Sequence, residues 1–332
     1  MPSEPHKTYE TKLDSSLRLH SVAANEDNNY FVIFINMEKD EIDYSEKLST
    51  FMAMTEINNQ DEALNYLTQY NQSLDIFETI NQHKPQIFIW LGNAVQIAEP
   101  NFVNPFKSNA HTPKYAYELY NKLSNLEEYK KLSATTDILG TYDDLDYGIV
   151  RGNRDFADKE YSKNRFLDFL EVPQGDGDPR REVGKGIYST YIYGNGDKSF
   201  RLIVLDTRFH KSNGIFKKDM LGEEQWEWLE NVLENDNEVF TFIISATPIL
   251  PFKRILNEGW YSESRKRLFK LLGRVNKNGI VFLSGGTKFA QISKTSCVLP
   301  GVNYNLYEIT SSGLSNTIGD VYMRIFCQMV LI

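Results

Sequence analysis

The sequence predicts an α/β protein, because segments with the pattern of buried strands alternate with segments of helical period. The runs YFVIFIN (30–36) and QIFIWLG (86–92) are almost wholly apolar and end at turn-forming residues, as strands covered on both faces do. Between them, residues 61–83 carry leucine, isoleucine and phenylalanine at helical spacings. A strand, a helix and a second strand in this order are typical of the α/β class.

The middle of the chain continues the alternation. Apolar and tyrosine residues at helical spacing predict one helix over 113–132 and a shorter helix over 161–170. Two β-rich runs within 186–208 flank the turn GNGD (194–197), which predicts a hairpin whose second strand is buried.

The last part repeats the helix and strand pattern twice. A helix is predicted over 222–235, with Trp226 on its apolar face, followed by the strand VFTFIIS (239–245). A further helix is expected to begin at Ser262, whose hydroxyl suits a helix cap, and to precede the strand IVFLSGG (280–286).

Composition and charge limit the kinds of partner. The 332 residues are 41% hydrophobic and 24% charged, the balance of a soluble globular protein. The formal charge is -9 and no dense lysine or arginine run occurs, so neither nucleic acid nor an anionic membrane is expected. We find no pattern of a secretory or transit peptide and no apolar run long enough to span a bilayer. With only two cysteines, we expect a soluble, intracellular protein.

The chain is predicted to hold one main domain. Residues 1–28 are polar without a clear period and are expected to form an N-terminal arm. Residues 29–318 then form the domain, and 319–332 form a C-terminal tail that is a candidate interface segment. Protein partners are expected at the arm, the tail and the inserted segment 40–72, since additions to a fold lie on its surface.

Several stretches resemble one family in its own order. They are PQIFIWLGN (85–93), YDDLDYG (142–148), LIVLDTR (202–208), FLSGGTKFAQIS (282–293) and YEITSSGL (307–314). Together they are similar to the PhoD-like branch of the calcineurin-like metallophosphatases, over roughly residues 30–318. Each motif alone is weak, and the ordered series is specific.

The resemblance implies a fold and a chemistry. The fold would be a four-layer α/β/β/α sandwich with two mixed sheets, and the site would lie where loops of both sheets meet. Members of the family use metal-bound water or hydroxide against phosphate esters. The positions that match the family's site are Asp143, Asp144, Asp146, Tyr147, Asp206 and Arg208.

Other ligand positions depart from the family's pattern. A neutral amide or a side chain without a suitable donor stands where the family has a carboxylate or a histidine; these positions are Asn93, Leu145, Gly286, Lys288 and Asn316. The ammonium of Lys288 would repel a cation, since its ordinary pKa is about 10.4. No metal cofactor is therefore expected; an active form would use Fe, Zn, Mn or Ca.

Three hypotheses follow. The first is a pseudophosphatase, without enzymatic activity, that serves as a structural or binding subunit of a larger assembly. The second is an altered, alkaline phosphatase D-like phosphoesterase that holds one cation on its remaining donors, which are Asp143, Asp144, Asp146 and Asn93. The third is a small-anion-binding protein that uses Arg208, Lys288 and Arg151.

Each candidate also has a purely structural interpretation. The three aspartates would cap a helix or close a turn. Arg208 would form an ion pair that ties its strand end to the Asp143 loop, and Lys288 would pair with Asp146 or a neighbouring acid.

Overall fold

The computed structural model describes residues 7–12, 17–23, 31–37, 49–53, 77–95, 98–100, 108–110 and 113–312, except for short gaps at 176, 215–217, 252–257, 288–289, 296–301 and 303. Lys288 and Asn316 lie outside the described residues, as do both cysteines and the tail 319–332. The insertion 40–72 is described only at one short strand.

The first sheet has six strands, all of them from the N-terminal half. Its strands are β1 (Lys7–Lys12), β2 (Leu17–Ala23), β3 (Phe31–Met37), β4 (Ser49–Ala53), β5 (Ile87–Leu91) and β8 (Asp137–Thr141), in this order across the sheet. The first four pair antiparallel, and β4, β5 and β8 pair parallel. Here β1 and β2 fall inside the segment 1–28 that we expected to be a separate arm. The prediction overlooked the alternation of apolar and polar residues in LRLH, the period of a half-buried strand.

The second sheet also has six strands. In order they are β15 (Gln291–Lys294), β16 (Tyr307–Thr310), β14 (Ile280–Ser284), β13 (Phe240–Ser245), β10 (Phe200–Val204) and β9 (Ser189–Tyr193). The four central strands run parallel, while β9 and β15 pair antiparallel at the two edges. The predicted hairpin is thus confirmed as β9 and β10, with a 3₁₀ turn at Gly196–Lys198 between them.

The described helices lie between the strands in sequence. They are α2 (Pro113–Ser124), α3 (Glu127–Ser133), α4 (Asp144–Tyr147), α5 (Lys159–Phe169), α6 (Glu223–Glu234) and α7 (Ser262–Val275), and residues 77–82 are helical as well. Small elements are a 3₁₀ turn at Pro179–Arg181 and two short pairs, β6 (Ala98–Pro100) with β7 (Ser108–Ala110) and β11 (Ser212–Asn213) with β12 (Lys218–Asp219).

Two helix predictions need correction. The single helix expected over 113–132 is two helices, because Leu126 adopts an extended backbone with ψ 130° between them. Ser262 is the first residue of α7 and not its cap; Tyr261 precedes the helix and provides no side-chain cap. No sign of the break between α2 and α3 is present in the sequence, because Leu126 continues the apolar helical period.

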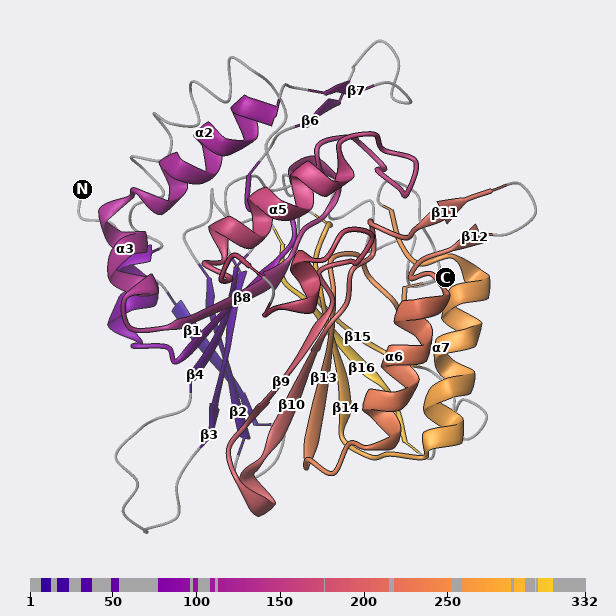
Figure 1. Ribbon diagram of the computed structural model, residues 1–332. Coiled ribbons are helices and arrows are strands. Elements are labelled where there is room, and N and C mark those ends of the chain that lie inside the picture. Colours follow the sequence, from indigo (N-terminus) through magenta and orange to yellow (C-terminus); the bar gives the residue numbers. More distant parts are fainter. Residues whose placement is uncertain are drawn as a thin grey trace, which may run out of the picture.

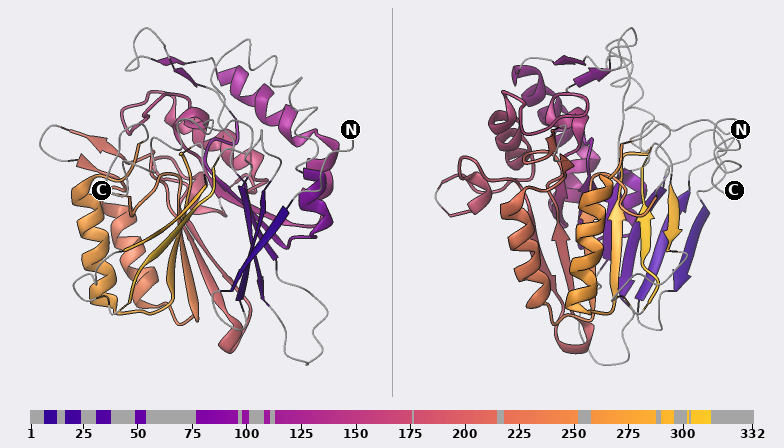
Figure 2. Two further views of the ribbon diagram at one scale, coloured as in Figure 1. Left: turned by 180° about the vertical axis from the view of Figure 1, so that it is seen from behind. Right: turned by 90° about the vertical axis from the view of Figure 1, so that its right-hand side faces the viewer.

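Three apolar clusters show how the layers pack. One lies between the sheets and joins residues of β5 and β8 to residues of β10, β13, β14 and β16. A second covers β5 with α2, α3 and α5, and a third covers β10, β13 and β14 with α6 and α7. Figures 1 and 2 show these two groups of helices on opposite sides of the pair of sheets. Complete burial of β5, β10 and β14 explains their near-continuous apolar sequences.

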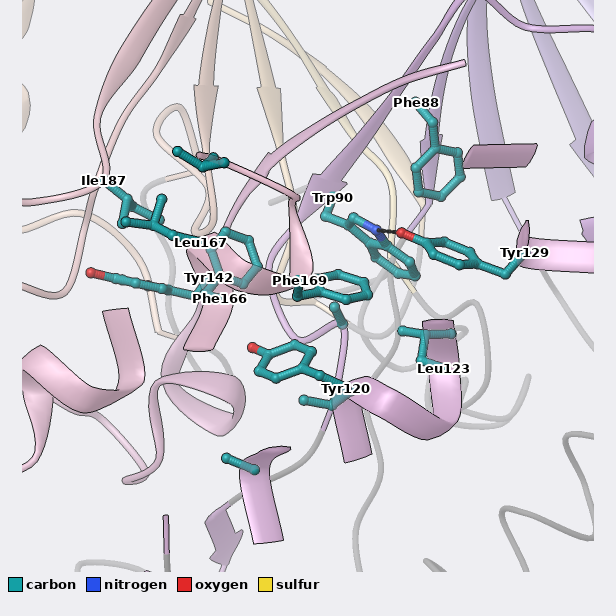
Figure 3. Packing of buried hydrophobic residues seen from close by; sticks show 14 of the residues in the cluster. Phe88, Trp90, Tyr120, Leu123, Tyr129, Tyr142, Phe166, Leu167, Phe169 and Ile187 are labelled. Carbon is teal, nitrogen blue, oxygen red and sulfur yellow. Dashed lines mark hydrogen bonds between the residues drawn. The ribbon is translucent and has the colours of Figure 1, made fainter. Parts of the chain in front are cut away.

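The cluster under α2, α3 and α5 is rich in aromatic rings (Figure 3). The indole N–H of Trp90 donates to the hydroxyl of Tyr129 at 3.2 Å. Phe169 stacks on Tyr129 with ring centroids 5.8 Å apart and lies 4.8 Å from the ring of Tyr120. These rings pack α2, α3 and α5 against β5 of the first sheet.

Strand β8 is also tied to the second sheet by hydrogen bonds. The hydroxyl of Thr141 donates to the carbonyl of Leu205 at 2.9 Å. Near the opposite end of β8, the hydroxyl of Tyr193 donates to the Asp137 carboxylate at 3.3 Å. The loop after β8 is therefore held in place relative to both sheets. In the described part of the chain, no helix is long and apolar enough to cross a membrane.

Candidate functional site

The candidate site lies beyond the carboxyl ends of strands from both sheets. Gly92, Asp143, Ala246 and Gly286 come shortly after β5, β8, β13 and β14. A Cβ on Gly92 would lie 2.6 Å from the Asp143 Cβ and 3.2 Å from the Ala246 Cβ, and a Cβ on Gly286 would lie 3.1 Å from Asp143 Oδ2. Loops of both sheets therefore meet at the Asp143 carboxylate, in the part of an α/β protein where ligands gather.

Arg208 provides the main partner of that carboxylate. Its Nε donates to Asp143 Oδ1 at 2.8 Å, and one of its terminal nitrogens donates to the same oxygen. The guanidinium is 0% exposed and Asp143 is 3% exposed. Burial raises the pKa of Asp143, and the Arg208 charge opposes that rise. Two guanidinium N–H groups thus donate to one carboxylate oxygen, the contact between Arg208 and the Asp143 loop that the structural interpretation predicted.

Glu258 extends the ion pair to a second cation. Its Oε2 accepts from Arg208 Nη1 at 2.7 Å, and its Oε1 accepts from Lys211 Nζ. Burial acts to raise the pKa of Glu258, but the charges of Arg208 and Lys211 outweigh it and hold that pKa at about 2. Burial, helped by the Arg208 charge, lowers the pKa of Lys211 to about 8. Two cations and two carboxylates thus form one buried network.

The carboxylate of Asp146 accepts hydrogen bonds from two backbone amides. Its Oδ1 accepts from the Asp143 amide at 2.6 Å, and its Oδ2 accepts from the Ala94 amide at 3.1 Å. With the Asp143 side chain, it completes a capping box at the start of α4. Asp146 is 0% exposed, and burial raises the pKa of its carboxyl. The helix-capping interpretation of this aspartate therefore agrees with the geometry.

The neighbouring polar side chains are also engaged with the backbone. Asn93 Oδ1 accepts from the Leu145 amide at 3.0 Å, so the amide at the end of β5 holds the first turn of α4. Asp144 Oδ2 accepts from the Arg151 amide at 2.8 Å. The Arg151 side chain is exposed, and the positive φ of its backbone, 57°, places it in a turn.

The contacts of Asp206 and Tyr147 are mainly with backbone groups. Asp206 accepts four hydrogen bonds: Oδ1 accepts from the amides of Arg208 and Phe209, each at 2.9 Å, and Oδ2 accepts from the Tyr142 hydroxyl at 2.6 Å and the Ile187 amide at 2.9 Å. It therefore fixes the turn that carries Arg208. The hydroxyl of Tyr147 donates to a backbone carbonyl, that of Asn153, at 3.2 Å.

The structure thus brings together most of the predicted positions and adds others. Asn93, Leu145, Gly286 and the three aspartates of the YDDLDYG motif lie close together, and Arg208 joins them through Asp143. The predictions for Lys288 and Asn316 fall outside the described residues. Sequence reasoning missed Lys211 and Glu258. Lys211 had one signal, its place three residues after Arg208, whereas Glu258 had none.

The donor atoms of the described residues do not fit a pair of metal ions. Within those residues no group of three or more histidine, cysteine, aspartate or glutamate side chains is placed to hold a metal ion. Asp143 accepts a hydrogen bond from the Arg208 guanidinium, and the side-chain oxygens of Asn93 and Asp146 accept hydrogen bonds from backbone amides. Gly286 and Leu145 have no side-chain donor atom.

The comparisons with known proteins support a PhoD-like fold. No protein-family model and no curated protein matches the sequence. Among solved structures, a structure of PhoD is similar, with a TM-score of 0.60 and 13% sequence identity. The match covers 90% of this chain and 65% of the PhoD chain, so this chain spans just under two thirds of that protein. At this identity the likeness concerns the fold.

Proposed function

We propose that this chain is a pseudophosphatase, a PhoD-like fold without an intact dinuclear metal site, which acts as a structural or binding subunit of a larger assembly. The observation that carries the proposal is the pair formed by Arg208 and Asp143. It lies where strand ends of both sheets meet, the place where the resemblance puts the family's metals.

Electrostatics supports this proposal. A divalent cation at Asp143 would lie beside a fully buried guanidinium, and repulsion between like charges grows as the local dielectric falls. Asp143 and Glu258 already balance the charges of Arg208 and Lys211. A metal would therefore require this network to be broken, which leaves buried charges unpaired.

Another departure from the family's metal-ligand pattern, at Asn93, also supports the pseudophosphatase proposal. The amide of Asn93 is neutral and cannot replace the carboxylate that would bridge two cations. Its oxygen accepts a hydrogen bond from the Leu145 amide instead.

We extend the proposal to the arrangement of layers: the three apolar clusters support a four-layer α/β/β/α sandwich.

The runner-up is a metal-dependent phosphoesterase with an altered site. It would need one cation, of Fe, Zn, Mn or Ca, on Asp143, Asp144, Asp146 and Asn93. Three of these side chains accept from backbone amides and the fourth binds Arg208, so the contacts favour the pseudophosphatase. As the main function, anion binding at Arg208 and Arg151 is not favoured, because Asp143 and Glu258 of the chain itself already pair with the Arg208 guanidinium.

The test is metal content by elemental mass spectrometry on protein purified without chelator, with phosphomonoesterase and phosphodiesterase assays in Mn, Fe, Zn and Ca. We expect no stoichiometric metal and no turnover. The variants Asp144→Ala and Asp146→Ala are compared with a control, Asp155→Ala, at a position whose side chain is 76% exposed. Bound metal and turnover that only the first two variants abolish would overturn the proposal.

The proposed place in an assembly has its own test. Protein isolated from its source under native conditions should elute at a mass well above that of the single 38.4 kDa chain. Removal of residues 319–332 should leave the domain folded and release the partner if the tail is the interface. A native protein that elutes as a monomer would contradict the assembly role.

A further inference from the structure

Two buried cationic side chains of the protein bind the carboxylate of Glu258. Each of its oxygens accepts from one of them, Oε2 from Arg208 and Oε1 from Lys211. Both cationic side chains are 0% exposed, whereas the side chain of Glu258 is 21% exposed. The side chain of Glu258 is therefore partly open to solvent, whereas the side chains of the two cations are not.

The charges of the network depend on Glu258. The two cationic side chains, Arg208 and Lys211, pair with two carboxylates, Asp143 and Glu258. Asp143 binds Arg208. Among the described residues, Glu258 is the carboxylate that binds Lys211 Nζ. Without Glu258, the buried Arg208 would lose one of its two carboxylate partners and the buried Lys211 would lose this partner altogether, which is costly.

We infer that Arg208 and Lys211 form a binding site for a small carboxylate ligand, and that Glu258 of this chain fills the site as an intramolecular ligand. A free monocarboxylate that displaces the Glu258 side chain carries the same charge as the group that it replaces. It can place one oxygen on the guanidinium and one on the ammonium, as Glu258 does.

The surroundings of the two cations suit this role. Asp206 fixes the backbone of the turn at Arg208, and the Lys211 ammonium lies 5.7 Å from the ring centroid of Tyr261. Each of the two residues thus has a contact besides the one to Glu258. A tethered carboxylate competes at high effective concentration, so free ligand should bind the intact protein weakly.

The inference rests on the proposed function in one respect. A metal ion at Asp143 would compete with Arg208 for that carboxylate and would change the charge of the site. Metal content is therefore measured on the same preparation. Bound metal counts against the proposed function, whereas metal-free protein that is indifferent to carboxylate counts against this inference alone.

The experiment compares Glu258→Ala with the unchanged protein in acetate and in chloride at equal ionic strength. Acetate should raise the thermal unfolding temperature of Glu258→Ala more than chloride does, and the apparent affinity for acetate should exceed that of the unchanged protein by about tenfold or more. The double variant Glu258→Ala/Lys211→Met should lose this response. Glu223→Ala, which removes an exposed partner of Arg267, is the matched control and should show none.

Each outcome decides the question. Equal effects of acetate and chloride on a folded Glu258→Ala protein would overturn the inference. If Glu258→Ala folds only in acetate, the inference is supported. If it folds in neither salt, Glu258→Asp replaces it, because the shorter side chain keeps the charge but reaches the cations less well. Acetate should then stabilise Glu258→Asp more than the unchanged protein, and no such difference would overturn the inference.

Discussion

Gly92 and Asp143 approach so closely that a Cβ on the glycine would lie 2.6 Å from the Cβ of the aspartate. Gly92 directly follows β5 and has a φ of 99°, a conformation that residues with a side chain rarely adopt. The contact therefore needs glycine for two reasons, its backbone angle and the missing side chain. It lets the loop after β5 reach the loop after β8.

The first prediction concerns this contact. Gly92→Ala should lower the free energy of unfolding by roughly 3 kcal/mol, because backbone strain and overpacking add. Gly175→Ala separates the two causes: Gly175 has a φ of 109°, but a Cβ there would meet no atom within 4 Å. Denaturant unfolding of both variants should show the larger loss at position 92. Equal losses would mean that the contact with Asp143 contributes nothing.

The buried ion pair gives the second prediction. Asp143→Asn should lower the free energy of unfolding by about 3–5 kcal/mol, because Arg208 would stay buried with one of its two charge partners removed. The control is Glu223→Gln at an exposed pair with Arg267, where the loss should stay below about 1 kcal/mol. Chemical denaturation measures both. A loss at Asp143 no larger than that at Glu223 would show that the buried pair does not stabilise the fold.

The third prediction is a dependence of stability on pH. The pKa of Glu258 is about 2 in the folded protein and ordinarily 4.5, so the folded state favours the charged form. The resulting stabilisation is complete above pH 4.5 and is lost as the pH falls through 2. Glu258→Gln should remove this contribution. Unfolding free energies measured between pH 6 and pH 2 should thus fall less steeply for the variant, and parallel curves would contradict the prediction.

Two buried tyrosines of one cluster provide the fourth prediction. The hydroxyl of Tyr142 donates to Asp206, whereas the described residues offer no hydrogen-bond partner to the buried hydroxyl of Tyr120. Tyr142→Phe should cost about 1.5–3 kcal/mol, since its acceptor is a carboxylate. Tyr120→Phe should leave stability unchanged or raise it, because an unsatisfied polar group disappears. Thermal unfolding of the two variants tests the difference, and a loss at Tyr120 equal to that at Tyr142 would contradict it.

The strands could be predicted where burial on both faces leaves a continuous apolar run. QIFIWLG became β5, and the hairpin around GNGD became β9 and β10. The break at Leu126 could not be predicted, because an apolar residue there continues the helical period. The strands β1 and β2 were overlooked because their polar composition outweighed a short alternation.

The site was predictable in part. One interpretation of the YDDLDYG carboxylates was a helix cap or a turn, and one interpretation of Arg208 was its ion pair with the Asp143 loop. The capping box of Asp143 and Asp146 and the ion pair are both present. The roles of Lys211 and Glu258 could not be predicted from sequence. They are 47 positions apart, and their contact depends on how the chain folds between them.

The hydrogen bonds from β8 to the second sheet have a consequence for how the protein unfolds. Thr141 and Tyr193 join β8 to the neighbouring sheet, one bond toward each end of the strand. Neither sheet can separate without breaking these bonds and exposing the apolar cluster between them. The two halves should therefore melt as one cooperative unit, with a single calorimetric transition whose measured enthalpy equals the van't Hoff enthalpy.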